Sequence, residues 1–357
     1  MNHLPRRTTR RRAPAAAVLL ATLVGLTACA DTDTGSGDGG GGAAGGETAG
    51  SLIVVTPNPV GGNNFLELAV QGAEAVADEQ GLDLRVFESS DPTSIQQNVE
   101  AAVREKPDIV VGLSFSLQDA FATVPTDNPD QQFLLVDGCP DPQPENVTCA
   151  AFREHEATYL AGVEAALLSR SKKIGVVAAL DTPFIRRWVD PFAAGAASVD
   201  PAVTASPLFV GGDNPFGDPA RGKAQAQVLA DQGVDQVLAA ASGSNVGTFE
   251  VATGGGFQAY GVDVNECGSA PGQVVDNVLK NVDVALAAAV GEILDGNAGG
   301  AKVYGLAEDG VGLTALEDDV ASSGCLIADH PDVIERVQEV RQQIVDGTVT
   351  VDDPAAG

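Results

Sequence analysis

Short apolar runs alternate with amphipathic stretches from Ser51 onward, and this alternation constrains the fold more than any other feature of the chain. The run at residues 52–56 predicts a strand, and the stretch at 64–80 predicts a helix whose apolar residues share one face and which Gly81 ends. Further strands are predicted at residues 82–87, 108–113, 132–137, 173–180, 203–210, 236–241 and 257–262. Helices are predicted between them, at residues 94–106, 117–123, 157–169, 184–198, 220–232 and 248–253.

These units fall into two successive sets, so we expect two α/β lobes, each with a doubly wound and mostly parallel sheet. About 305 residues follow the N-terminal segment, more than one hydrophobic core usually supports. A helix at 272–294, a strand at 302–306 and a helix at 331–345 complete the prediction. Ligands bind beyond the carboxyl ends of parallel strands, and a cleft between the lobes is therefore the expected binding site.

The first residues have the features of a bacterial secretory signal. Five arginines precede a short apolar run that ends in Leu26-Thr27-Ala28-Cys29. This run is shorter and richer in alanine than a membrane span, which needs about 20 apolar residues. Residues 1–28 are therefore predicted to be a lipoprotein signal peptide. Cleavage before Cys29 would expose that cysteine for lipid attachment.

Residues 29–51 are rich in Gly and Asp, a composition that predicts a flexible tether to the extracytoplasmic face of the cell membrane. An ordinary signal peptide with a chance cysteine is the alternative. The paired arginines leave the twin-arginine export route open beside general secretion.

Acidic residues strongly outnumber basic ones. The sequence has 49 Asp and Glu against 20 Lys and Arg, a net charge of −29. Nucleic acid and anionic membrane surfaces would repel such a chain, so neither is an expected partner.

Four cysteines follow Cys29, and an even number in an exported chain predicts disulfides. Cys139 and Cys149 flank a proline-rich turn, and a bridge between them would close a short loop. Cys267 and Cys325 are then left to form a second, longer bridge. A zinc site is disfavoured because no two cysteines lie two to four residues apart. Neither a metal nor a cofactor is expected.

Polar and aromatic residues gather where the predicted strands end. They are Asn63, Asn64, Phe65, Asp137, Phe216 and Asp263. Exposed phenylalanines beside carboxylates suit a ligand with a flat ring and several hydroxyls, because the ring stacks on the aromatics and the carboxylates accept hydrogen bonds from the hydroxyls. For each Phe taken alone, a place in the core is the alternative.

Several short motifs follow one another between residues 52 and 345. They are FLLVD (133–137), EATYLAG (156–162), FGDPARG (216–222), GVD (261–263), NVLKNVD (277–283), and YGL (304–306) before GVGL (310–313). In order and spacing these motifs resemble the basic membrane lipoproteins, or PnrA-like purine nucleoside receptors, a family of substrate-binding proteins of ABC importers. The resemblance implies a two-lobe, periplasmic-binding-protein-like type I fold that binds a nucleoside, rather than an enzyme.

The resemblance also implies roles for single residues. The base-stacking aromatics of the family fall on Phe65 and Phe216, its ribose-binding acid on Asp263 and its cleft lysine on Lys280. Asp137 matches the acid at the end of the fourth strand. The turn that approaches the ligand with backbone groups contains Ser242 and Gly243.

One position departs from the pattern of the family. Relatives commonly have Asn after the first stacking aromatic, whereas this chain has Leu66 and Glu67 there. Asn63 or Asn64 would supply the amide that reads the edge of the base, or Glu67 would give a different specificity. The edge contacts matter because an unpaired buried polar group is costly.

We expect one lobe to contain residues 52–152 with about 264–306, and the other to contain 153–263 with about 307–346, leaving 347–357 as a tail. The implied partners are a permease and its ATPase, and the protein is expected to be a monomer. A module for riboflavin or a sugar, a sensor module, and a nucleoside-processing enzyme are the alternatives. No assembled catalytic motif supports the enzyme, and His155 is predicted to be a solvated surface residue.

Overall fold

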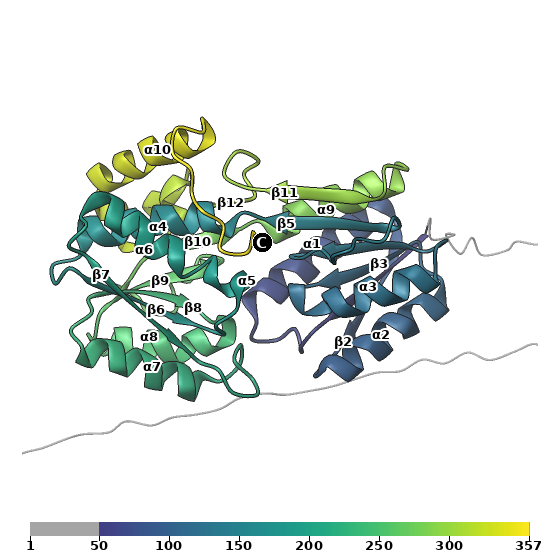
Figure 1. The fold of residues 1–357 in the computed structure, drawn as a ribbon, viewed down its shortest axis with the longest axis horizontal. Coiled ribbons are helices and arrows are strands. Elements are labelled where there is room, and N and C mark those ends of the chain that lie inside the picture. Colours follow the sequence, from purple (N-terminus) through teal and green to yellow (C-terminus); the bar gives the residue numbers. More distant parts are fainter. Residues whose placement is uncertain (1–49, 357) are drawn as a thin grey trace, which may run out of the picture. The chain divides into compact units, whose positions relative to one another are not determined.

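The computed structural model describes residues 50–356. The predicted signal peptide, most of the tether and Cys29 lie outside the described residues. The described chain contains two six-stranded sheets, each of which forms the centre of one lobe (Figure 1).

The first sheet has the strand order β11-β5-β4-β3-β1-β2. Its strands are β1 (Gly50–Thr56), β2 (Leu82–Glu88), β3 (Ile109–Leu113), β4 (Gln132–Val136), β5 (Val147–Phe152) and β11 (Gly300–Tyr304). All of its strand pairs are parallel.

The second sheet repeats this arrangement in the order β12-β10-β9-β8-β6-β7. Its strands are β6 (Lys173–Ala178), β7 (Thr204–Phe209), β8 (Gln236–Ala240), β9 (Gln258–Asp263), β10 (Val274–Lys280) and β12 (Val311–Leu313). The pairing of β10 with β12 is antiparallel, and the other pairs are parallel. The predicted fold, two mostly parallel α/β lobes, is confirmed.

Helices cover both faces of each sheet. In the first lobe α1 (Asn64–Gln80) packs against α9 (Val282–Leu294), and α2 (Pro92–Glu105) packs against α3 (Gln118–Asp127). Alternate residues of β1 face opposite ways: Leu52 and Val54 join the cluster around α1, whereas Ile53 and Val55 join the cluster around α2 and α3. Because β1 is buried on both faces, its sequence is a nearly continuous apolar run.

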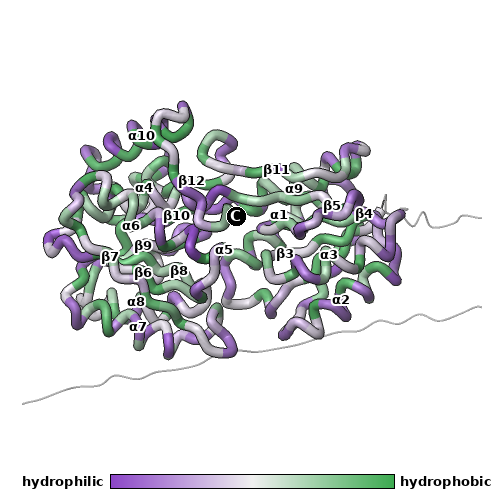
Figure 2. Tube along the Cα trace, viewed as in Figure 1, coloured by the Kyte–Doolittle hydropathy of each residue, from purple (hydrophilic) through white to green (hydrophobic). Residues whose placement is uncertain are grey.

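In the second lobe α4 (Glu154–Leu168) packs against α6 (Asp190–Val199), and α7 (Pro219–Asp231) packs against α8 (Asn245–Thr253). The short α5 (Pro183–Arg186) precedes α6, and α10 (Pro331–Val345) packs on α4. Figure 2 shows hydrophobic residues along central strands such as β8 and β9, and hydrophilic residues recurring along outer helices such as α7.

Helix α1 has the bounds that the sequence predicts, because both of its ends carry local signals. The Asn63 side chain caps the first turn by accepting the Leu66 N–H, and Gly81 ends the helix in the left-handed conformation, with φ of 70°.

The helix predicted over 272–294 is wrong. Its first part is strand β10, which pairs with β9 and β12 in the second sheet, and only α9 is helical. Residues 274–280 are therefore also misplaced in the predicted first lobe. A short buried strand and a buried helix cannot be separated by apolar periodicity, and no Gly or Pro separates this strand from the helix that follows. Strands β5 and β12 were not predicted at all.

The chain passes between the lobes at three places: at Arg153, at Asn281 and at residues 305–310. Backbone hydrogen bonds connect these crossovers to neighbouring strands and to one another, from Arg153 N to Tyr304 O (3.0 Å) and from Asn281 N to Gly310 O (3.0 Å). The Leu306 N–H also donates to Glu156 (2.9 Å). The three crossovers therefore form one connected hinge.

Both predicted disulfides are present. Cys139 and Cys149 are bonded with their Cα atoms 5.4 Å apart, and Cys267 and Cys325 are bonded with a Cα separation of 5.1 Å. In the chain-entropy description the longer loop, with a sequence separation of 58 residues, contributes about 4 kcal/mol and the shorter one about 3 kcal/mol.

An acid pair is buried in the core of the second lobe. Glu164 of α4 is fully buried, and neither of its carboxyl oxygens has a hydrogen-bond partner among residues 50–356. Burial, with the neighbouring Asp276 carboxyl, raises the pKa of Glu164 well above its ordinary value. Burial also raises the pKa of Asp276 to about 7. Glu164 therefore holds its proton to higher pH in the folded protein than in the unfolded chain.

We predict that Glu164→Gln stabilises the protein at neutral pH. The unfolded chain ionises this carboxyl above its ordinary pKa of 4.5, so the free energy of unfolding falls as the pH rises from that value toward the raised folded-state pKa. Because Gln does not titrate, the variant should have the higher Tm at pH 7.5, and the difference should shrink toward pH 4.5. Thermal unfolding followed by circular dichroism from pH 4.5 to 8 measures this. Glu74→Gln, at an exposed position on α1, is the control, and a Glu164→Gln Tm at or below wild type at pH 7.5 contradicts the prediction.

Candidate functional site

A pocket lies between the two lobes, at the carboxyl ends of the central strands of both sheets. It encloses about 610 Å³ of space not filled by atoms, part of it open to solvent. The residues that line it come from both lobes, among them Asp137 of the first and Asp263 of the second. It is also the place where a ligand site is expected in open parallel sheets, because strand order reverses there between β1 and β3 and between β6 and β8.

Four residues at strand ends reach this pocket in an unusual backbone conformation. Ser114 and Asp137 follow β3 and β4 with φ of 92° and 69°. Ser242 follows β8 with φ of 50°, and Asp263 ends β9 with φ of 70°. All four line the pocket. Left-handed backbone at residues other than Gly costs about 1–3 kcal/mol and clusters at functional sites.

Aromatic rings from both lobes form much of the wall. They are Phe65, Phe115, Phe184, Trp188 and Phe216. Phe115 of the first lobe stacks on Phe184 of the second, with ring centroids 4.3 Å apart. Phe216 meets the edge of Phe115 at 6.5 Å.

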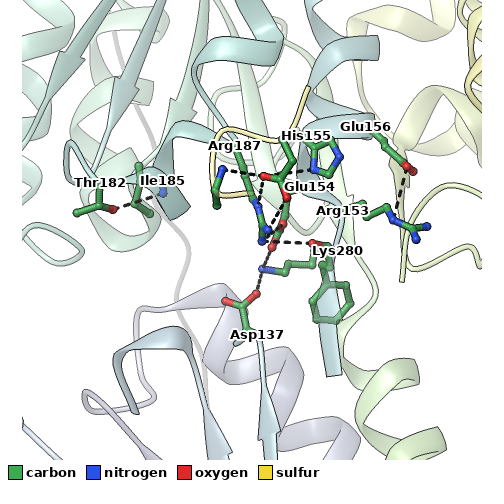
Figure 3. A network of polar contacts seen from close by, with 12 residues as sticks. Asp137, Arg153, Glu154, His155, Glu156, Thr182, Ile185, Arg187 and Lys280 are labelled. Atoms are coloured by element: carbon green, nitrogen blue, oxygen red, sulfur yellow. Dashed lines mark hydrogen bonds and ion pairs between the residues drawn. The ribbon is translucent and has the colours of Figure 1, made fainter. Parts of the chain in front are cut away.

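Lys280 lies at the centre of the charged part of the site. Its side chain is 2% exposed and pairs with Asp137 of the first lobe and with Glu154 at the first crossover, the latter at 2.8 Å (Figure 3). Its ammonium group also lies 5.1 Å from the centre of the Phe65 ring and 5.7 Å from that of Trp188. Burial opposes the charged form, but the two carboxylates outweigh it and raise the pKa of Lys280.

The carboxyl groups around Lys280 differ in their acidity. Burial raises the pKa of Asp137 while the adjacent Lys280 lowers it, and burial raises the pKa of Asp263 to about 6. Burial also acts on Glu154, but Lys280 and Arg187 together hold its pKa below the ordinary value. Asp263 is therefore ionised at neutral pH, and it lines the pocket.

A second layer of charges lies behind Glu154. Arg187 donates to Glu154 at 3.4 Å and to both carboxylate oxygens of Asp353 at 2.7 Å. His155 lies beside them, with its Nδ1 4.0 Å from Asp353. His155 is 6% exposed, and burial lowers its pKa. The prediction of a solvated His155 is wrong, because residues of the C-terminal segment, which follow it by some 200 positions, cover it.

The structure brings most of the predicted site residues together. Those that line the pocket are Asn63, Phe65, Asp137, Phe216, Ser242, Asp263 and Lys280. Asn64 and Gly243 instead line a neighbouring hollow at the rim.

The rim residues hold the two lobes in contact. The Asn64 amide donates to Glu266 of the second lobe at 3.1 Å. A Cβ atom on Gly243 would lie 2.7 Å from the carbonyl oxygen of Gly62 in the first lobe, so the lobes approach each other there without room for a side chain. Glu67 accepts the Gly62 N–H at 2.9 Å and is not among the pocket-lining residues.

Sequence reasoning missed Ser114, Phe115, Phe184, Trp188, Glu154 and Arg187. The rule that found Asp137 also applies to Ser114 and Phe115, because they directly follow a predicted strand. Phe184 and Trp188 were placed in a helix and carried no separate signal. The Arg187–Asp353 contact joins residues 166 positions apart, and no local pattern predicts it.

The arrangement is suited to binding and offers no metal site or membrane span in the part of the chain described. No group of His, Cys, Asp and Glu in residues 50–356 is placed to hold a metal ion. Within the same residues, no helix combines the length and the apolar character needed to cross a membrane.

Comparisons with known proteins agree with this geometry. The family model for the ABC transporter substrate-binding protein PnrA-like (Bmp) family matches residues 49–343. A relative from Listeria monocytogenes, described as a CD4+ T-cell-stimulating antigen, is 29% identical over 294 residues, which are 76% of this chain and 78% of the relative. An ABC transporter nucleoside-binding protein BmpA from Lactococcus lactis is 31% identical over 206 residues, or 57% of this chain and 58% of that protein.

A comparison with solved structures also finds a substrate-binding protein of an ABC transporter. An ABC transporter solute-binding protein from Aeropyrum pernix superposes with a TM-score of 0.75 at 25% identity, covering 85% of this chain and 93% of that one. The two-lobe fold, the pocket at the strand ends and the family match over most of the chain agree. The chain therefore belongs to the Bmp family of PnrA-like ABC transporter substrate-binding proteins, which are not enzymes.

Proposed function

We propose that this protein binds a nucleoside, most specifically a purine nucleoside, and delivers it to the permease and ATPase of an ABC importer. In this proposal Cys29 carries a lipid that anchors the protein on the extracytoplasmic face of the cell membrane. The observation that carries the proposal is the composition of the pocket wall, where aromatic rings stand beside Asp263, a carboxylate ionised at neutral pH.

The distances between the aromatic rings of the wall limit which pair of rings can hold a base between them. A ring held between two others separates them by about 7 Å, twice a van der Waals contact of about 3.5 Å. Phe115 and Phe184 lie too close together for this, at 4.3 Å. Phe65, Trp188 and Phe216 remain, and we assign the base to Phe65 and Phe216, which come from opposite lobes.

The remaining groups suit the ribose. Asp263 accepts hydrogen bonds from hydroxyls, while Lys280, which pairs with Asp137, lies on the same wall. A charge-assisted hydrogen bond contributes roughly 1.5–3 kcal/mol. The similarity to the Lactococcus lactis protein, a nucleoside-binding protein, supports the same class of ligand.

A thermal-shift screen against purine and pyrimidine nucleosides, free bases, riboflavin and sugars tests the proposal. A ligand at 100 times its Kd should stabilise the protein by about 2.7 kcal/mol. Stabilisation by riboflavin or a sugar, and not by any nucleoside, would contradict it.

We predict that Asp263→Asn lowers nucleoside affinity by about tenfold or more, because the hydroxyls lose a charged acceptor. The wild-type protein should bind more weakly as the pH falls below about 6, where Asp263 becomes protonated; the variant should lack this dependence. Calorimetry between pH 5 and 7 measures both effects. Asp213→Asn, at an exposed residue on the rim, should bind like wild type. Equal affinity in folded Asp263→Asn would remove Asp263 from the site.

The aromatic role can be separated from simple space filling. Phe216→Ala should weaken nucleoside binding by about tenfold, since base–aromatic stacking contributes roughly 1–3 kcal/mol. Phe216→Leu keeps much of the volume but removes the ring, so it should lose nearly as much affinity. The titration can be followed by the emission of Trp188, which lines the pocket and is the single tryptophan of the chain. A Phe216→Leu variant with wild-type affinity would rule out stacking.

The anchor has its own test. Cys29→Ser should abolish lipid attachment and leave the protein in the medium or as an unprocessed precursor. Membrane fractionation with mass spectrometry of the mature N-terminus measures this. If Cys29→Ser is processed and stays with membranes like wild type, the lipid-anchor proposal is wrong.

A further inference from the structure

We infer that Asp353, in the segment that follows α10, is a positioning residue for the ligand pocket and acts through Arg187. Asp353 does not line the pocket. It fixes the guanidinium of a residue that stands between two pocket-lining aromatics in the sequence, Phe184 and Trp188.

The contact itself is specific. Nε and Nη2 of Arg187 each donate to a different oxygen of Asp353 at 2.7 Å, the paired geometry that orients a guanidinium best. The side chains are 16% and 21% exposed. The Ala355 N–H donates to the same carboxylate at 2.9 Å, so the backbone of the segment also holds Asp353 in place.

Arg187 transmits this placement to the pocket in two directions. Its guanidinium lies 5.6 Å from the centre of the Phe184 ring, which forms part of the wall. Its Nη1 reaches Glu154 at 3.4 Å, and Glu154 in turn pairs with Lys280 (Figure 3). A continuous set of contacts therefore runs from Asp353 to the aromatic wall and to the central lysine.

The C-terminal segment is held in place independently of this contact. Val349 and Val351 pack against the hydrophobic core. The segment runs from α10 to a chain end beside α5, between the elements of the two sheets (Figure 1). Asp353 is thus presented to Arg187 by a segment with its own anchoring in the second lobe.

The test compares Asp353→Asn, which removes the charge but keeps the shape, with Asp352→Asn, its exposed neighbour. Trp188 is 6% exposed and its emission reports on the pocket wall without a ligand. Asp353→Asn should shift this emission to longer wavelength and increase its quenching by acrylamide. Asp353→Glu should largely restore both signals, and Asp352→Asn should match wild type.

Affinity gives a second measurement, which rests on the proposed nucleoside function. Asp353→Asn should weaken binding by about two- to thirtyfold, the range for residues that act on a site without touching the ligand. In an Arg187→Gln background the same change should add nothing, because Asp353 acts through Arg187. If the wild-type protein binds no nucleoside, the proposed function fails while the Trp188 emission still decides the role of Asp353.

The inference would be overturned if folded Asp353→Asn had the emission and the affinity of the wild type. It would also be overturned if the effects of Asp353→Asn and Arg187→Gln on affinity were fully additive. If Asp353→Asn does not fold, Arg187→Lys decides the question. That variant keeps the charge but loses the paired contact, so it should show the same emission shift, and an unshifted spectrum would contradict the inference.

Discussion

The buried ammonium group of Lys280 is the interaction on which the arrangement of the lobes depends. Removing such a charge from water costs several kcal/mol, and only well-placed partners offset this cost. Its partners come from different parts of the fold: Asp137 ends β4 in the first lobe, and Glu154 begins α4 at the first crossover. Lys280 itself ends β10, just before the second crossover at Asn281. The ammonium group of Lys280 therefore contacts residues of both the pocket and the hinge.

The two lobes supply equivalent positions to the site because their sheets share one strand order. Asp137 after β4 corresponds to Asp263 at the end of β9, and Ser114 after β3 corresponds to Ser242 after β8. All four have positive φ. The chemistry nonetheless differs between the lobes, since the ion pairs of Lys280 include Asp137 but not Asp263. The repeated fold thus places Asp137 and Asp263 at equivalent positions in the two lobes, and the ion pair with Lys280 makes their surroundings different.

The sequence predicts what local chemistry determines. The ends of α1 follow from Asn63 and Gly81, and Asp137 and Asp263 follow from the rule that sites lie beyond strand ends. Prediction from sequence fails where a contact between distant residues determines the local structure or the burial of a side chain. Residues 274–280 become a strand because β9 and β12 pair with them, and His155 is buried because the segment around Asp353 covers it. A buried strand and a buried helix can have the same apolar periodicity, and a histidine has the same sequence neighbours whether it is buried or exposed. Neither the strand at 274–280 nor the burial of His155 can therefore be derived from a short stretch of sequence.

The two lobes also touch directly at the pocket and its rim. Phe115 stacks on Phe184 across the lobes, and Gly243 approaches the Gly62 carbonyl too closely to admit a Cβ atom. Both contacts join the two lobes, and the crossovers at Arg153, Asn281 and 305–310 are the only backbone connections between the lobes within residues 50–356. Glu154, one of the two carboxylates that pair with Lys280, lies at the first of these crossovers. The hinge and the charged part of the site therefore share Glu154, and Arg187, which binds Asp353, contacts the same carboxylate.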